Sequence, residues 1–363
     1  MTDEPRLGTP VDRIDTPALL IDLDLFQKNA SRMAQYFDTR ATALRPHAKT
    51  HKCPRIALTQ LELGACGITC AKLGEAEVMA DVGIRDILIA NQIVGKIDRL
   101  TNLAARCDLM VAVDSATNVT ELSRGCQEKG VSLRVLVEVD IGMDRCGVQS
   151  GEPTRALAHR VVDAPSLHFA GLQAYEGHLV LQERKKRERG IQVAAEMLQQ
   201  SCDLLEQDGI PVSLVSGGGT GTYDLSGNTP PWNEIQAGSY ILMDATYVKV
   251  RPEFRPALSV LASVISRPVP ERIVTDAGMK VMTHEFGLPQ PIGVDGLSLT
   301  RLSEEHGKLI AEHPAQLALQ PGDKIRFLPT HGCTTINLHD RFYVIQDGVL
   351  VDIWSITARG RAQ

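Results

Sequence analysis

The chain has 363 residues, of which 43% are hydrophobic and 23% charged, with a net charge of −6 and eight cysteines. This length predicts two domains, or one barrel with an addition, and the acidic balance argues against general nucleic-acid binding. No apolar run of about 18 residues occurs, so no membrane span is expected, and the polar N-terminus lacks a secretory h-region. Scattered cysteines without compact disulfide spacing are typical of reduced thiols in a cytoplasmic protein.

The first 250 residues alternate short apolar runs with segments of helical periodicity. A strand-like stretch, "PALLIDLDLF", comes first. Eight further runs resemble strands of a buried parallel sheet, at 42–49, 66–72, 86–92, 108–114, 134–140, 168–177, 212–219 and 234–240. The segments between them carry apolar residues at helical spacing, and several end at a glycine. The basic stretch "ERKKRERG" is predicted to be the solvated face of a long helix.

Strand followed by helix, repeated about eight times, is the signature of a (β/α)₈ TIM barrel, although a doubly wound open sheet shows the same alternation. Beyond residue 250, apolar runs separated by Gly, Pro and Asp turns indicate antiparallel strands. We therefore predict an α/β protein with a barrel domain at 20–248. A second, mostly antiparallel β domain is predicted at 249–363, joined by the N-terminal segment 1–19.

A glycine-rich loop follows the seventh predicted strand, in the sequence "VSGGGTGTYD". Barrel enzymes build their sites at the carboxyl ends of the strands, and commonly bind phosphate after strands seven and eight. Closely spaced glycines expose backbone N–H groups to an anion. The loop and the segment "QAGSY" after the eighth strand are therefore candidates for a phosphate cradle, with a plain flexible turn as the alternative.

The first barrel strand ends in a cluster of basic residues, "TALRPHAKTHKCP", with Lys49 between His47 and His51. A lysine beside other cations and partly removed from water has a lowered pKa and a nucleophilic amine. Together with a phosphate cradle, this lysine suggests a phosphorylated aldehyde cofactor, pyridoxal 5'-phosphate, bound to Lys49 as a Schiff base. The alternative is a solvated basic loop.

Several motifs occur in the order of one known family: "RPHAKTHK", "RCGV", "GLQAYEG", "SGGGTGTYD", "EIQAGSY" and "NLHD". With them the chain, from about residue 16 to 360, resembles the pyridoxal-phosphate enzymes of the alanine-racemase-like type (fold type III), in particular the D-threonine aldolase and D-serine dehydratase group. The resemblance implies a barrel followed by a β domain, a homodimer, and a lyase that acts on small D-3-hydroxy-α-amino acids.

The resemblance also assigns roles to residues. Lys49 matches the Schiff-base lysine, Tyr175 a tyrosine near the cofactor ring, and Arg145 an arginine in the cofactor pocket. The remaining matches are residues of the two phosphate-binding segments: Gly218, Gly219, Thr220, Gly238, Ser239 and Tyr240.

In this family a histidine and a second ligand two residues later bind a divalent metal beside the cofactor. In "PTHGCTTINLHD" these residues are His331 and Cys333. Alternate residues of an extended segment point the same way and can reach one ion. Imidazole with thiolate suits Zn²⁺, whereas Mn²⁺ or Mg²⁺ prefer carboxylates. Outside this context, a buried cysteine near a loop histidine is the plainer interpretation.

Two lyase reactions are compatible with the motifs. Retro-aldol cleavage gives glycine and an aldehyde, and dehydration gives a keto acid and ammonia. Most of the motifs resemble the aldolases, but Cys333 stands where aldolases usually have aspartate, which follows the dehydratases. The base histidine of the aldolases is replaced by Leu181, so His178 is the candidate base.

Two further classes share the barrel. Non-catalytic cofactor carriers lack a second domain, so residues 250–363 argue against that function. A racemase needs a second acid or base, commonly a tyrosine of the β domain, and Tyr343 lies there in an ordinary strand pattern. We therefore expect a lyase, with the aldolase reaction favoured and the dehydratase reaction as the alternative.

Overall fold

The computed structural model describes residues 5–363, so the first four residues of the predicted N-terminal segment lie outside the described part. The chain groups into two compact units that exchange short segments. The barrel unit comprises Met33–Lys49, Ile56–Gly238 and Gly360–Gln363. The β unit comprises the residues up to Arg32, Thr50–Arg55 and Ser239–Arg359. Helix α1 (Leu23–Asp38) contributes residues to both.

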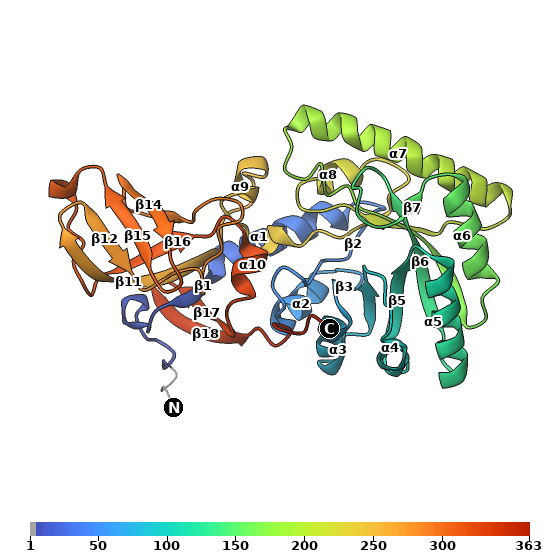
Figure 1. Cartoon of the computed structure of the whole chain (residues 1–363), viewed down its shortest axis with the longest axis horizontal. Helices are drawn as coiled ribbons and strands as arrows, with labels where there is room; N and C mark the ends of the chain where they lie inside the picture. Colours follow the sequence, from blue (N-terminus) through green and yellow to red (C-terminus); the bar gives the residue numbers. More distant parts are fainter. Residues whose placement is uncertain (1–4) are drawn as a thin grey trace. The chain divides into compact units, whose positions relative to one another are not determined.

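Eight parallel strands form the sheet of the barrel unit (Figure 1), and a short strand, β7 (Val148–Gln149), pairs beside β6. Their order in the sheet is β2-β10-β9-β8-β6-β5-β4-β3. Their bounds are β2 Ala43–Leu44, β3 Ile68–Cys70, β4 Asp86–Ile89, β5 Asp108–Val113, β6 Leu133–Asp140, β8 Leu167–Ala174, β9 Leu214–Gly217 and β10 Glu234–Ile235. All eight predicted runs are therefore strands, although several are shorter than predicted.

Backbone hydrogen bonds join the two ends of this strand order. The N–H groups of Cys66 and Thr69 donate to the carbonyls of Leu44 and Pro46, and the N–H of Ala48 donates to the carbonyl of Thr69. These bonds connect the chain after β2 to β3. An open sheet would leave both edges unpaired, so the predicted barrel is confirmed over the doubly wound alternative.

Helices cover the outer side of the barrel strands (Figure 1). Their bounds are α2 Pro54–Glu62, α3 Leu73–Asp81, α4 Ile97–Ala104, α5 Ala116–Lys129, α6 Glu152–Val162, α7 Arg184–Gln207 and α8 Tyr223–Ser226. Helix α5 shows how a capping serine and a terminal glycine in the sequence mark the two ends of a helix. The Ser115 hydroxyl accepts the N–H of Asn118 at its start, and Gly130 adopts a left-handed φ of 69° at its end.

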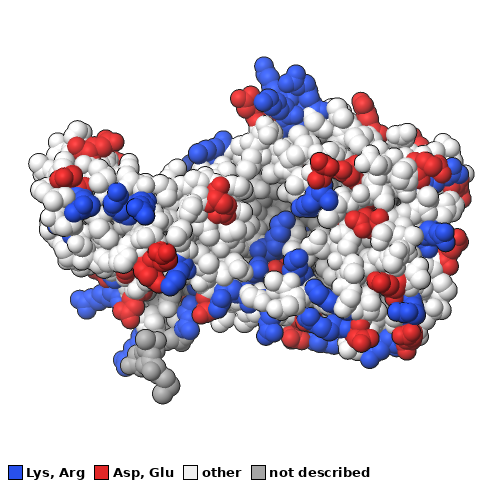
Figure 2. Space-filling model, in the orientation of Figure 1, with Lys and Arg blue, Asp and Glu red and all other residues white. Residues whose placement is uncertain are grey.

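Charged side chains of both signs are spread over the visible surface, and Lys and Arg atoms gather over the start of α7 (Figure 2). The predicted solvated face is confirmed for Arg184, Lys185 and Lys186. It is wrong for Arg187, which is buried. Among residues 5–363, no helix is long and apolar enough to cross a membrane.

The β unit is a mostly antiparallel sheet in the order β14-β15-β12-β11-β1-β17-β18, with β16 on β11 and β13 on β16. Its strands are β1 Ala18–Asp22, β11 Leu258–Val269, β12 Arg272–Thr275, β13 Gln290–Ile292, β14 Leu297–Leu302, β15 Gly307–Ala311, β16 Lys324–Leu328, β17 Arg341–Gln346 and β18 Val349–Ser355. Its short helices are η1 Val11–Arg13, η2 Ser239–Ile241, α9 Tyr247–Val250, η3 Pro314–Gln316 and α10 Gly332–Ile336.

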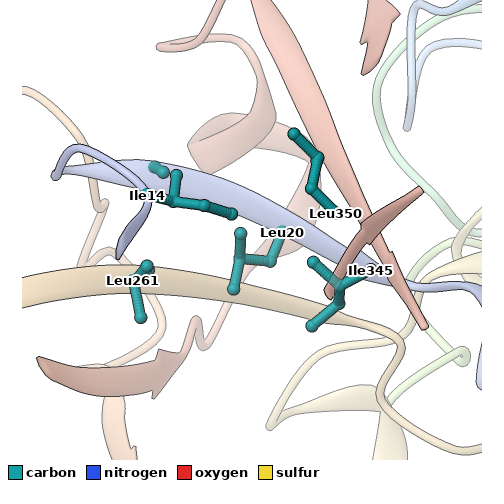
Figure 3. Close-up of a cluster of buried hydrophobic side chains, with 6 residues drawn as sticks. Ile14, Leu20, Leu261, Ile345 and Leu350 are labelled. Atoms are coloured by element: carbon teal, nitrogen blue, oxygen red, sulfur yellow. The ribbon is translucent and has the colours of Figure 1, made fainter. Parts of the chain in front are cut away.

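The early strand-like stretch forms β1, in the middle of the β unit. It pairs antiparallel with β11 and parallel with β17. Leu20 of β1 lies in a buried apolar cluster with Leu261 of β11 and Ile345 of β17 (Figure 3). Ile14 and Leu350 complete the labelled cluster. Burial of apolar side chains from both ends of the chain explains why β1 belongs to this sheet.

Candidate functional site

The glycine-rich loop runs from the end of β9 at Gly217 to the start of α8 at Tyr223. Two of its glycines are required by the geometry. Gly218 has a φ of +72°, which side chains other than glycine rarely adopt. A Cβ at Gly221 would lie 2.0 Å from the carbonyl oxygen of Val180. The loop is therefore a closely packed turn at the carboxyl end of a barrel strand, where phosphate sites occur.

Hydrogen bonds from side chains hold this loop. The N–H of Gly218 donates to Oε2 of Glu176 at 3.1 Å, and the N–H of Gly219 donates to Oγ1 of Thr222 at 3.1 Å. The Thr222 hydroxyl in turn donates to Oε1 of Glu176 at 2.7 Å. Thr220 is also buried. Glu176 was not predicted to take part in the site. Its position next to Tyr175 in "AYEG" was the one sequence feature that placed it near the predicted cofactor.

Lys49, Arg145 and the glycine-rich loop meet around the ring of Tyr175. Lys49 Nζ lies 5.5 Å from the ring centroid, and the Arg145 guanidinium carbon lies 5.7 Å from it. A Cβ at Gly219 would lie 3.4 Å from the same ring. The barrel unit thus brings an amine, an arginine and a closely packed glycine-rich turn together, and these groups fit a phosphorylated pyridine aldehyde.

Arg145 also faces a buried carboxylate. One of its terminal nitrogens lies 4.0 Å from Glu138 Oε1, and Gln92 donates to Glu138 Oε2 at 2.5 Å. Burial raises the pKa of Glu138, while Gln92 and Arg145 oppose that effect. The sequence had pointed to Arg145 but not to Glu138.

The histidines near Lys49 are structural. His47 is buried, and its Nδ1 accepts the N–H of Lys49 at 3.4 Å. Within the β unit, Nδ1 of His51 accepts the N–H of Cys53 at 3.1 Å. Both imidazole rings thus accept a backbone N–H from a residue two positions further along the chain.

The candidate base His178 is exposed and lies beyond the end of β8. Its ring packs against the loop after β6, because a Cβ at Gly142 would lie 3.2 Å from His178 Nε2. The imidazole therefore belongs to the same strand-end face of the barrel as Tyr175.

The second predicted phosphate segment crosses from one unit to the other. Gly238 is the last residue of its barrel-unit segment, and Ser239 and Tyr240 begin η2 in the β unit. The Tyr240 side chain is buried, with its ring centroid 5.9 Å from that of Phe254. Its ring thus packs in the core of the β unit.

His331 and Cys333 lie at the start of α10. His331 is the residue before the first helical turn, and Cys333 is already inside the helix. The expected extended segment is therefore wrong. The Cys333 side chain is nevertheless close enough to His331 to raise the pKa of its imidazole. The start of a helix can thus bring residues two positions apart together.

Three contacts within the β unit hold this pair. Glu285 Oε1 lies 2.7 Å from His331 Nδ1, Asp244 Oδ2 accepts the N–H of Gly332 at 3.0 Å, and Cys333 Sγ lies 3.4 Å from Thr50 Oγ1. Burial lowers the pKa of His331, but Cys333 and then Glu285 outweigh it, so the pKa is raised to about 9.

The donor chemistry of this pair fits a metal. A carboxylate on one imidazole nitrogen leaves the other to face an ion, as in many metal sites. Nitrogen and thiolate donors suit Zn²⁺. Within residues 5–363, no group of three His, Cys, Asp or Glu residues gathers to form a larger ligand set.

Known protein families match both the barrel part and the β part of the chain. The family model described as alanine racemase, N-terminal domain, matches residues 21–246, and a domain model named for serine dehydratase matches residues 257–345. The chain is 42% identical to the D-threonine aldolase of an Arthrobacter species, over 97% of this chain and 95% of that protein.

Two solved structures are also similar over nearly the whole chain. D-threonine aldolase from Filomicrobium marinum has a TM-score of 0.95 and 40% identity, and the match covers 98% of this chain and 99% of that one. D-threo-3-hydroxyaspartate dehydratase from Delftia sp. HT23 has a TM-score of 0.86 and 28% identity, with 96% and 98% covered. A cysteine-to-alanine variant of D-threo-3-hydroxyaspartate dehydratase was solved in a metal-free form.

One conclusion follows from the barrel, the β sheet, the lysine with its glycine-rich loop, and the matches along the whole chain. This chain belongs to the D-threonine aldolase and D-serine dehydratase family of pyridoxal-phosphate enzymes with an alanine-racemase-type barrel.

Proposed function

We propose that this protein is a pyridoxal-phosphate- and metal-dependent lyase that cleaves D-3-hydroxy-α-amino acids to glycine and an aldehyde. The observation that carries the proposal is the meeting of Lys49, Arg145 and the 217–221 loop around Tyr175. Similarity along nearly the whole chain to a D-threonine aldolase supports the aldolase reaction over dehydration.

In the proposed site, the Lys49 amine would hold the cofactor aldehyde, and Gly218, Gly219 and Thr220 of the glycine-rich loop would surround its phosphate. The N–H groups of Gly218 and Gly219 already donate to Glu176 and Thr222, so these two glycines would allow the close approach of the phosphate rather than donate to it. Gly238, Ser239 and Tyr240 are proposed to bind the same phosphate. Tyr175 and Arg145 are the residues that would hold the cofactor ring. Pyridoxal phosphate, when bound, supplies an electron sink for negative charge at the substrate Cα.

His331 and Cys333 are proposed as ligands of a divalent metal, with Zn²⁺ favoured by the thiolate and Mn²⁺ or Mg²⁺ as alternatives. A metal there supplies a Lewis acid for the substrate hydroxyl. His178 is proposed to accept the hydroxyl proton, after which the Cα–Cβ bond breaks and Cα takes up a proton. If the base instead removes the proton at Cα and the hydroxyl departs, the products are a keto acid and ammonia.

D-Threonine separates the two reactions directly. We expect the holoenzyme, supplied with pyridoxal phosphate and Zn²⁺ or Mn²⁺, to give glycine and acetaldehyde in equal amounts. Chromatography of the amino acid and derivatisation of the aldehyde measure both products. Formation of 2-oxobutanoate with ammonia would establish the dehydratase reaction, and D-alanine/L-alanine interconversion without cleavage would establish a racemase.

Glu285 orients the proposed metal ligand, so its removal should weaken metal binding. We expect Glu285→Ala to lower the affinity for Zn²⁺ by about 10- to 100-fold, because the His331 ring loses the partner that fixes it. Competition against a chromophoric chelator measures this affinity. The matched control is Glu305→Ala, which removes an exposed partner of Lys280 and should leave metal binding unchanged. Equal affinities in Glu285→Ala and the wild type would exclude this role.

Two features of the setting are part of the proposal. The eight cysteines are free, which fits a reducing compartment, and we propose the cytoplasm. The family resemblance favours a homodimer, which sedimentation velocity tests directly.

A further inference from the structure

Glu176 is a fully buried carboxylate behind the glycine-rich loop. It follows β8 and accepts three hydrogen bonds from the segment after β9. The N–H of Gly218 donates to Oε2, and the hydroxyls of Thr222 and Ser226 donate to Oε1. Nothing in the proposed reaction uses this side chain.

A carboxylate at this place has an electrostatic cost. A phosphate bound in the neighbouring loop would repel a negative charge there. What the carboxylate offers in return is its capacity to accept several hydrogen bonds. An ionised carboxylate has no donor, so it can take all three of these donors at once. These three hydrogen bonds fix the shape of the loop.

Glu176 fixes two consecutive N–H groups of the loop. It binds Gly218 directly. It also accepts a hydrogen bond from the Thr222 hydroxyl, which turns a lone pair of that hydroxyl toward the N–H of Gly219. At the other end of the loop, the buried Arg187 of α7 donates to the carbonyl of Gly221. The loop is thus tethered at both ends by buried charged side chains of the barrel unit.

We propose that Glu176 is a positioning residue for the phosphate group of the cofactor, acting through Thr222 on residues 218–222. The inference rests on the proposed function, because it needs pyridoxal phosphate in this loop. The positioning role predicts a defect that is specific to phosphate binding. Without Glu176, the loop loses its ordered shape and the phosphate loses its binding site, while the Lys49 amine stays intact.

Pyridoxal provides the matched probe, because it carries the same aldehyde but no phosphate. The apoenzyme is titrated with each compound, and the change in absorbance gives both dissociation constants. For Glu176→Ala we expect binding of pyridoxal phosphate to weaken by about tenfold or more, since a buried donor loses its partner. Binding of pyridoxal should change by less than about twofold. Thr222→Val, which keeps the side-chain shape but removes the relaying hydroxyl, should behave like Glu176→Ala.

The control is Glu75→Ala, which also removes a buried carboxylate that accepts two backbone N–H groups, but at α3. It should keep the wild-type ratio of the two affinities. Should Glu176→Ala not fold, Thr222→Val decides alone. Equal weakening of both compounds, or no weakening of either, would overturn the positioning role. Failure of the wild-type apoenzyme to bind pyridoxal phosphate would instead overturn the proposed function.

Discussion

Lys49→Ala is expected to remove the absorbance of bound cofactor near the visible edge and to lower turnover of D-threonine by about a thousandfold or more. The Lys49 amine is the proposed nucleophile, and its Nζ lies 5.5 Å from the centroid of the Tyr175 ring, against which Gly219 also lies. Without it, the aldehyde has no covalent attachment at this place. Absorbance spectra of the purified variant and product assays with D-threonine measure both effects.

The matched control is Lys52→Ala, a change of the same residue type in the same sequence motif. Lys52 donates to Asn337 in the β unit and has no role in the proposed cofactor site. This variant should keep the absorbance band and most of the turnover. A Lys49→Ala protein that retains both the band and the activity would contradict the assignment of Lys49.

Cys333→Ala is expected to lose its metal and nearly all activity while it keeps bound pyridoxal phosphate. The thiolate is one of two proposed protein ligands, so its removal leaves His331 alone to hold the ion. Elemental analysis gives the metal content, and the absorbance spectrum shows whether the cofactor remains. Chelation of the wild-type enzyme should have the same effect, reversed by added Zn²⁺ or Mn²⁺.

Cys333→Asp should tell more about the metal than Cys333→Ala, which only removes a ligand. A carboxylate favours harder ions, so this variant should regain activity with Mn²⁺ better than with Zn²⁺. Cys107→Ala is the control, since this thiol contacts the Leu103 carbonyl beside α4. Full metal content in Cys333→Ala would show that the ligand lies elsewhere.

The periodicity of the sequence predicted the barrel well because its strands are buried. Val111 of β5 and Val137 of β6 are fully buried, and such strands appear as continuous apolar runs. The three strands β13, β14 and β15 were not predicted one by one. Leu297, Leu299 and Leu302 of β14 alternate with exposed residues, so the edge of this sheet has a weaker apolar signal.

Candidate site residues could be predicted where the residue type itself indicates a chemical role. They could not be predicted where the role depends on contacts with residues distant in the sequence. Lys49 and the glycines stand at strand ends, so their positions could be predicted from the sequence. Glu176, Glu285 and Arg187 act through hydrogen bonds to residues at least 34 positions away. Such partners are set by packing, which one sequence does not display. The same limit led to the wrong expectation for Arg187, which is buried.

Reduction of the holoenzyme with borohydride, followed by proteolysis and peptide mass mapping, tests the central assignment most directly. Reduction makes the bond between amine and cofactor permanent, so the modified lysine can be identified. The account predicts a phosphopyridoxyl group on the peptide that carries Lys49. A modification at another lysine, or no modified peptide from an enzyme that cleaves D-threonine, would contradict it.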